Sequence, residues 1–143
     1  MQVATTLSGA SLHVRIENDS DATVHIFDSA RMPYFILDAA DLLVLFGVNA
    51  PDPEVDYFMI EIPTTRPLEP GAVVEHDLAL DAVTLGDHYE TDRETTPLEP
   101  PVTVRCEVGW GTTPIVESER HLYSIESVLA WQQLAKADPI TLD

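Results

Sequence analysis

Positive charge is scarce in this chain. Its 143 residues include 25 Asp and Glu but only 7 Lys and Arg, and Lys136 is the single lysine, so the formal net charge is −18. Nucleic-acid binding depends on neutralising phosphates with Lys and Arg, and anionic membranes attract the same residues. We therefore expect no nucleic-acid or membrane partner, whereas a cationic protein or a metal ion is compatible with the charge. A GC-rich genome or a salty cytoplasm would also produce such acidity.

Cysteine is limited to Cys106, which excludes an internal disulfide. Alternation places Cys106 between Val104 and Val108 on the apolar face of a strand, which predicts a buried, inert thiol rather than a nucleophile. No stretch approaches the ~18 apolar residues of a transmembrane helix, and the N-terminus lacks a basic start and an apolar run of signal length. These absences predict a cytoplasmic protein.

Sequence motifs of catalysis are also missing. The chain has no G-x-S-x-G elbow, Walker loop, G-x-G-x-x-G or H-E-x-x-H pattern. The sequence therefore predicts no enzyme and no cofactor. A small enzyme assembled from distant residues is the alternative, with His76 on the inward side of its strand as a candidate. An inward histidine is more often a satisfied core residue.

Short segments of alternating apolar and polar residues dominate what is present. This two-residue period predicts half-buried β-strands. The predicted strands are residues 12–18, 22–28, 34–37, 42–48, 57–62, 73–80 and 102–110. The first two would pair as a hairpin across the turn formers at 18–21. A short helix capped at residues 38–41 is the alternative to the fourth strand, and the acidic, proline-rich residues 83–101 predict a long connection.

The C-terminal segment changes to a helical period. Ser124 is a suitable N-cap, and Lys136 falls in the last turn, where a cation suits the helix dipole. We predict a helix over residues 124–137 and a short strand at 140–142. A strand through residues 128–131 is the alternative.

The number of short strands, separated by Pro, Gly and Asp, is typical of an antiparallel β-sandwich. We predict one mainly β domain over residues 1–143, immunoglobulin-like or a related Greek key, with one short C-terminal helix. The classification rests on strand count, because the Cys…Trp…Cys signature of immunoglobulin domains is absent.

Two acidic loops are the predicted contact regions. Asp52, Glu54 and Asp56 alternate as in a calcium loop, but Tyr57 and Pro63 stand where an EF-hand requires Gly and Glu. We therefore predict no metal site, with calcium shared between loops as the alternative.

The second loop combines carboxylates with one histidine, which is too little for zinc. Its candidate residues are Asp87, His88, Glu90, Asp92 and Glu94. Trp110, within Gly109-Trp110-Gly111 at a predicted bulge or turn, is a further contact candidate if it is exposed, because tryptophan anchors interfaces.

The chain combines long polar loops with a strand-rich scaffold and has no catalytic motif. This combination predicts a non-catalytic protein-binding or assembly module. Assembly could include homo-oligomers. The alternative is an acidic inhibitor or immunity-type protein that masks a cationic enzyme, to which its net charge of −18 would steer it.

Overall fold

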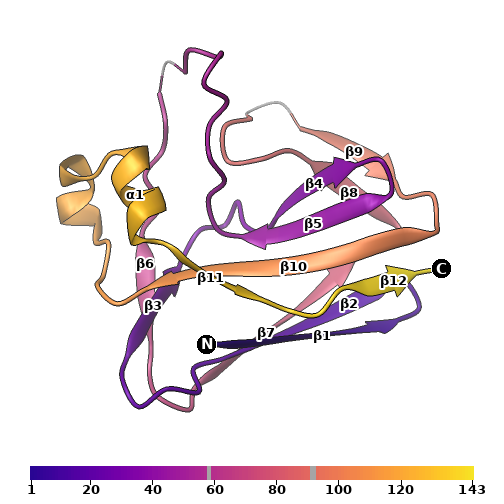
Figure 1. The fold of residues 1–143 in the computed structure, drawn as a ribbon, viewed down its shortest axis with the longest axis horizontal. Helices are drawn as coiled ribbons and strands as arrows, with labels where there is room; N and C mark the ends of the chain where they lie inside the picture. Colours follow the sequence, from indigo (N-terminus) through magenta and orange to yellow (C-terminus); the bar gives the residue numbers. More distant parts are fainter. Residues whose placement is uncertain (58, 91–92) are drawn as a thin grey trace.

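β-strands make up most of the regular structure, as predicted (Figure 1). A computed structural model describes residues 1–57, 59–90 and 93–143. Its strands are β1 (Gln2–Ser8), β2 (Ser11–Glu17), β3 (Val24–Phe27), β4 (Tyr34–Asp38), β5 (Asp41–Phe46), β6 (Thr65–Leu68), β7 (Val73–Ala79), β8 (Ala82–Leu85), β9 (Glu94–Pro97), β10 (Val102–Gly111), β11 (Gln133–Lys136) and β12 (Ile140–Leu142). The helices are η1 (Glu117–Leu122), a 3₁₀-helix, and α1 (Ile125–Trp131).

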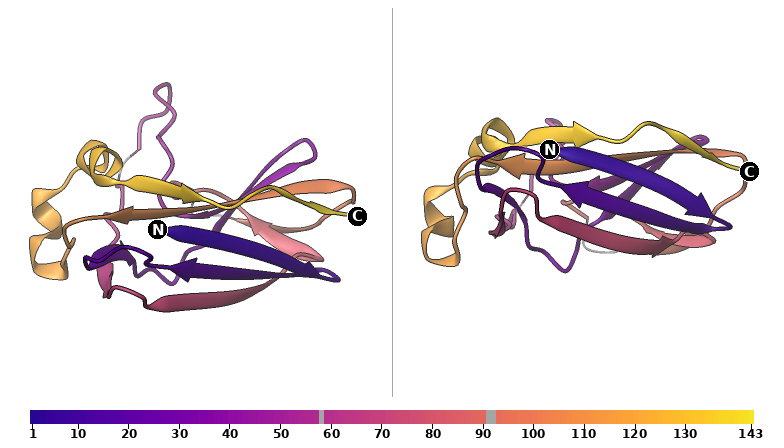
Figure 2. Two further views of the ribbon diagram at one scale, coloured as in Figure 1. Left: turned by 60° about the horizontal axis from the view of Figure 1, so that its bottom comes forward. Right: turned by 90° about the horizontal axis from the view of Figure 1, so that it is seen from below.

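The strands form three sheets. One is antiparallel with the order β1-β2-β7, a larger one follows β4-β5-β10-β3-β6, and β8 pairs with β9. Strand β10 is the centre of the larger sheet, with β5 and β3 along one side and β12 and β11 along the other. Figure 2 shows β1, β2 and β7 as a layer beside the layer that contains β10 and β11.

One hydrophobic cluster joins the two larger sheets. Alternate residues of β2, β5 and β10 are buried in it, so the period that predicted these strands also predicted their inward faces. These residues are Leu12, Val14, Ile16, Leu42, Val44, Val104, Cys106 and Val108. A second, smaller cluster joins Ile125 and Val128 of α1 to Val48 and Ile115 of the connecting segments. It holds one end of the molecule together.

The predicted hairpin between residues 12–18 and 22–28 is wrong, although both segments form strands, β2 and β3. Strand β2 pairs with β1 and β7, whereas β3 pairs with β10 and β6. The cause is Asn18, whose buried amide Nδ2 donates to the carbonyls of Ala22 and Leu68, both at 2.8 Å. Its own carbonyl accepts from Gly71 N–H. These bonds direct the chain from one sheet into the other.

The expectation of a wholly antiparallel fold is also wrong, because β5 and β10 run parallel. The long excursion of residues 47–101 between them makes this pairing possible, since parallel neighbours need a crossover. The alternative helix, capped at residues 38–41 and ending at Gly47, does not form, because β5 (Asp41–Phe46) lies there. Asp38 lies opposite Asp41 across a two-residue turn, with Ala39 at a φ of 53°.

Two connections differ from the prediction. Residues 83–101 contain paired strands, β8 and β9, rather than a continuous loop. The strand predicted at residues 57–62 is absent from its described part, and Phe58 lies outside the described residues. Strand β1 was not predicted. Val3 is buried in the main core, and Leu7 packs against it.

The predicted C-terminal helix is correct only in its first half. Ser124 caps α1, and Ser127 completes a capping box, but the chain then turns at Gln132 and pairs with β10 as β11. The final strand at 140–142 is confirmed as β12. In the described part of the chain, no helix has the length and hydrophobicity that a membrane crossing requires.

Candidate functional site

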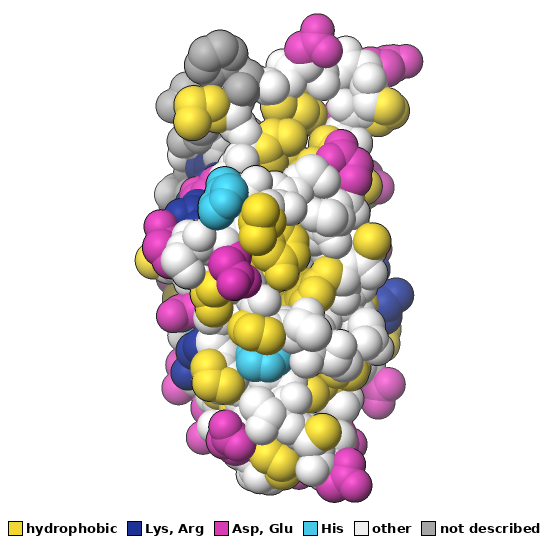
Figure 3. All heavy atoms as spheres, turned by 90° about the vertical axis from the view of Figure 1, so that its left-hand side faces the viewer, with side chains coloured by type: hydrophobic (Ala, Val, Ile, Leu, Met, Phe, Trp, Pro, Cys, Tyr) yellow, Lys and Arg dark blue, Asp and Glu magenta, His cyan; other side chains and the backbone are white. Residues whose placement is uncertain are grey.

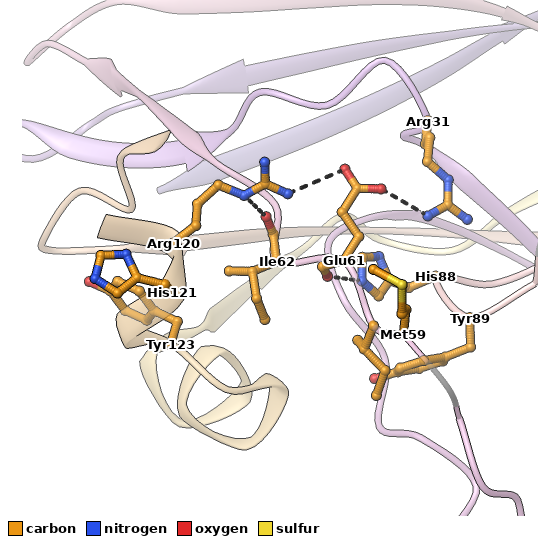
Figure 4. A pocket seen from close by; sticks show the side chains of 10 residues that line it. Arg31, Met59, Glu61, Ile62, His88, Tyr89, Arg120, His121 and Tyr123 are labelled. Carbon is orange, nitrogen blue, oxygen red and sulfur yellow. Dashed lines mark hydrogen bonds and ion pairs between the residues drawn. The ribbon is translucent and has the colours of Figure 1, made fainter. Parts of the chain in front are cut away.

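A cavity of about 580 Å³ opens at the end of the molecule held by the smaller core cluster. Four segments bound it: residues 59–62, the turn after β8, η1 with the Tyr123 that follows it, and the connection between β3 and β4 that carries Arg31 (Figure 4). The lining residues are Arg31, Met59, Ile60, Glu61, Ile62, His88, Tyr89, Arg120, His121 and Tyr123. Apolar and aromatic walls with a few polar groups, at this volume, are typical of ligand pockets.

The carboxylate of Glu61 lies between two arginines of this cavity (Figure 4). Arg31 Nη1 is 3.5 Å from Glu61 Oε2, and Arg120 Nη2 is 3.9 Å from Glu61 Oε1. Both separations exceed the usual length of a charge-assisted hydrogen bond, about 2.7–2.9 Å. Arg120 Nη1 also reaches the carboxylate of Glu117 at 3.1 Å. Glu61 is therefore held loosely.

His88 connects two of the segments that bound the cavity, because it hydrogen-bonds to the backbone of Glu61. Its imidazole is 4% exposed, its Nε2–H donates to the Glu61 carbonyl at 2.6 Å, and its Nδ1 lies 2.9 Å from the Tyr34 hydroxyl. A carbonyl only accepts, so Nε2 carries the proton and Tyr34 donates to Nδ1. Burial lowers the pKa of His88, against the opposing effect of the Glu61 carbonyl, and burial raises the pKa of Tyr34. Both ring nitrogens serve a structural role.

The hydroxyl groups of the two tyrosines that line the cavity are already hydrogen-bonded within the protein. Tyr89 donates to the Asn49 carbonyl at 2.6 Å, and Tyr123 donates to the Pro114 carbonyl at 3.3 Å. Burial raises the pKa of Tyr89, whose ring packs against Tyr57 at 4.9 Å between centroids. The rings therefore serve as fixed walls.

Large apolar side chains are exposed on the segments around the cavity. They are Val55 (47% exposed), Met59 (85%), Val116 (37%) and Leu122 (70%), here called the apolar rim. Figure 3 faces this end of the molecule and shows hydrophobic side chains gathered among scattered acidic ones. Covering side chains of this size would be favourable, at about 1.5–3 kcal/mol for each one fully buried.

The first acidic loop projects from the body of the molecule (Figure 1). Asp52, Glu54 and Asp56 are all exposed there, and Asp52 Oδ1 accepts the Glu54 N–H at 2.9 Å. The stacking of Tyr57 on Tyr89 brings the base of this loop beside the turn that holds His88. The base of the first loop is therefore adjacent to the turn that holds His88, although Asp52, Glu54 and Asp56 do not line the cavity.

The second acidic loop is more structural than its sequence suggests. Asp87 is half-buried and accepts from Tyr89 N–H at 2.9 Å and from Asn49 Nδ2 at 3.1 Å. Glu90 and Glu94 are exposed, whereas Asp92 lies outside the described residues. The partner-binding role of these residues stays a prediction.

Trp110 lies within β10 rather than in a turn. It is half-buried, stands opposite Ile26 and Gln133 in the sheet, and packs against the main core. Trp131 covers the adjacent Gly111. Trp110 therefore presents only part of its side chain to solvent, and its role as a contact residue stays a prediction.

The remaining candidates for a catalytic role, Cys106 and His76, are packed within the protein. Cys106 is buried, and burial followed by the charge of Glu107 raises its pKa to about 12. His76 stacks on Phe46 at 4.7 Å, and burial followed by the charge of Arg66 lowers its pKa. Among the described residues, no group of three or more His, Cys, Asp or Glu is arranged to hold a metal ion.

No family model, curated protein or solved structure matches this chain in comparisons with known proteins. Function is therefore argued from the geometry of the cavity and the apolar rim. Sequence reasoning missed the grouping of Arg31, Glu61 and Arg120, because these residues are far apart in the chain and form no local motif. The one sequence signal that could have drawn attention to Arg31 and Arg120 was that arginine is scarce in this chain.

Proposed function

We propose that the protein is a non-catalytic binding module that docks a protein partner at the apolar rim and the cavity beneath it. The observation that carries this proposal is the exposure of Met59, which lines a cavity of about 580 Å³, and of Leu122, which lies between the lining residues His121 and Tyr123. Single exposed apolar residues are ordinary on protein surfaces, but a group of them around a hollow is typical of an interaction site.

The contacts within the cavity favour binding over catalysis. His88 uses both ring nitrogens inside the protein, and the hydroxyl groups of Tyr89 and Tyr123 are bonded to backbone carbonyls. A general base needs a free nitrogen or oxygen within reach of the substrate proton. Glu61 is more accessible, but each of its carboxylate oxygens faces an arginine guanidinium group.

We also propose the finer fold class, a β-sandwich in which the β1-β2-β7 sheet packs on the sheet centred on β10. The shared core of residues from β2, β5 and β10 supports it. The immunoglobulin-like or Greek-key classification, the single domain over residues 1–143 and the cytoplasmic location stay predictions.

Substitution of the apolar rim tests the binding function. The variant Met59→Glu/Leu122→Glu places two charges on the rim. The control Val73→Glu/Leu134→Glu makes the same change at apolar side chains exposed elsewhere, on β7 and β11. We expect a partner cross-linked from source cells to be retained by the wild type and the control but lost with the rim variant. Equal retention, or equal loss from both variants at matched stability, would overturn the proposal.

The exposed first loop favours a second candidate, the acidic protein that masks a cationic enzyme. In the described structure, Asp52, Glu54 and Asp56 make no salt bridge, and their loop projects from the body (Figure 1). Binding that depends on this charge should weaken steeply from low to physiological salt. Affinity for a basic partner that is indifferent to salt would reject this candidate.

A further inference from the structure

We propose that the cavity takes the C-terminal residue of the partner protein. Its α-carboxylate would lie at the guanidinium groups of Arg31 and Arg120, and its apolar side chain would pack against Ile60, Ile62 and Tyr123. This inference rests on the proposed binding function and names the part of the partner that is recognised. Capture of a terminal carboxylate is an established mode of peptide recognition.

The first argument is the distribution of positive charge. The chain has only 7 Lys and Arg against 25 Asp and Glu, yet two arginines meet at one cavity. An internal carboxylate, Glu61, already lies between them, which marks where a carboxylate is stabilised. Because its separations are 3.5 and 3.9 Å and its side chain is 48% exposed, Glu61 leaves Arg31 Nη1 and Arg120 Nη2 with long contacts only, whereas Arg120 Nη1 is hydrogen-bonded to Glu117.

The second argument is that both arginines are held in place before any ligand binds. Arg31 Nη2 donates to the Glu90 carbonyl at 3.0 Å, and Arg120 Nε donates to the Ile62 carbonyl at 2.8 Å. The Arg31 guanidinium also packs over the ring of Tyr34, 5.5 Å from its centroid. The entropy cost of ordering these side chains is therefore already met, which favours binding. The planar guanidinium suits a carboxylate.

The third argument decides between a chain end and a free organic acid. A small acid would fill the cavity and leave Met59 and Leu122 exposed on the apolar rim. A polypeptide that enters by its C-terminus would fill the cavity with its last side chain and cover the rim with the residues before it. The exposed apolar surface outside the cavity thus favours the C-terminus of a protein over a small organic acid.

The surrounding charge defines the rest of the partner's tail. Glu117, 79% exposed, lies beside Arg120, and Glu119 is also exposed on the same helix. With a net charge of −18, the protein as a whole repels anions at long range. We therefore expect basic residues upstream of the terminal apolar residue, because they would be attracted to these carboxylates.

A labelled peptide tests the inference with the purified full chain. The probe ends in Lys-Lys-Ser-Leu with a free carboxylate, and its control carries a C-terminal amide. By fluorescence anisotropy, we expect the free acid to bind at least tenfold more tightly, because the amide loses charge-assisted hydrogen bonds. Equal affinity of the two peptides, or binding by neither, would overturn the inference. Octanoate binding without binding of the acid peptide would also overturn it, in favour of a small-acid pocket.

Variants assign the preference to the cavity. Arg31→Met should abolish the preference for the free acid, while Arg15→Met, the same change at an arginine on β2 outside the cavity, should preserve it. Glu61→Gln should raise affinity for the acid several-fold, since it removes the internal competitor. If Arg31→Met does not fold, an unchanged or lower affinity of Glu61→Gln still contradicts the inference. If the wild type shows no preference for the free acid while the rim variant still abolishes partner capture, the inference alone is rejected and the proposed binding function stands.

Discussion

The side-chain amide of Gln132 completes the hydrogen bonding of the Val48 backbone just beyond the end of β5. Its Oε1 accepts the Val48 N–H and its Nε2–H donates to the Val48 carbonyl, both at 2.9 Å. Val48 is only 2% exposed, so water cannot readily replace these bonds. The Gln132 side chain therefore acts where a neighbouring strand would otherwise supply backbone partners, and α1 ends at this residue.

Replacement of Gln132 by methionine should be strongly destabilising. The change keeps the length of the side chain but leaves a buried N–H and a buried carbonyl of Val48 unpaired, at about 1–3 kcal/mol each. We expect the free energy of unfolding, measured in urea, to fall by about 2–5 kcal/mol. The control Gln133→Met alters the adjacent exposed residue and should stay within about 0.5 kcal/mol of the wild type. A similar loss in both variants would show that the Val48 contact is not the cause.

The helix predicted over residues 124–137 is too long because the chain leaves α1 at Gln132 and joins the sheet. The helical period runs on to Leu134, but the edge of β10 offers backbone partners to residues 133–136, and sheet pairing outweighs local helix propensity there. Leu134 is consequently 43% exposed on β11 rather than buried under a helix. The positions of strands such as β2, β5, β7 and β10 were predictable because alternation is a local property. Strand pairing was not, because it depends on distant contacts such as those of Asn18 with Ala22 and Leu68.

The buried His88 makes stability depend on pH in a defined direction. Burial lowers its folded pKa below the usual 6.5, so the unfolded chain binds more protons in the interval between the two values. The stability that His88 contributes is therefore complete above about pH 6.5 and declines as the pH falls through that interval. The charged or titratable groups that act on it are Arg31, Tyr34, Glu61, Asp87 and Tyr89.

His88→Gln should reduce this loss of stability on acidification. Urea unfolding between about pH 7.5 and pH 5 should give a shallower decline for His88→Gln than for the wild type. His76, whose pKa is also lowered by burial, should leave a residual decline. Identical slopes for the wild type and His88→Gln would contradict the prediction.

The candidate site was predictable only in outline. Acidity and proline content marked residues 51–56 and 83–101 as surface regions, and Asp52, Glu54 and Asp56 are indeed exposed. No local pattern indicated that His88 turns inward, because its partners Tyr34 and Glu61 are distant in sequence. Side chains that meet from separate segments become visible only once the packing of those segments is known.

Gly111 and Trp131 form a close contact that the sequence did not reveal. Gly111 is buried in β10, and a Cβ atom there would overlap the indole ring of Trp131. That ring is fixed, because its Nε1–H donates to the Thr113 carbonyl at 2.9 Å and its face packs near Phe27, 5.3 Å between centroids. The glycine is needed for close approach of α1 to the sheet, rather than for a turn.

Gly111→Ala should therefore destabilise the protein by about 1–3 kcal/mol through overpacking. Because the displaced indole gains contact with water, we also expect the tryptophan emission of the folded protein to shift to longer wavelength. In a Trp131→Leu background the obstructing ring is absent, so the same glycine substitution should cost clearly less, and urea unfolding of the four proteins gives the coupling energy. An equal cost in both backgrounds would mean that backbone effects in β10, not Trp131, set the requirement for glycine at residue 111.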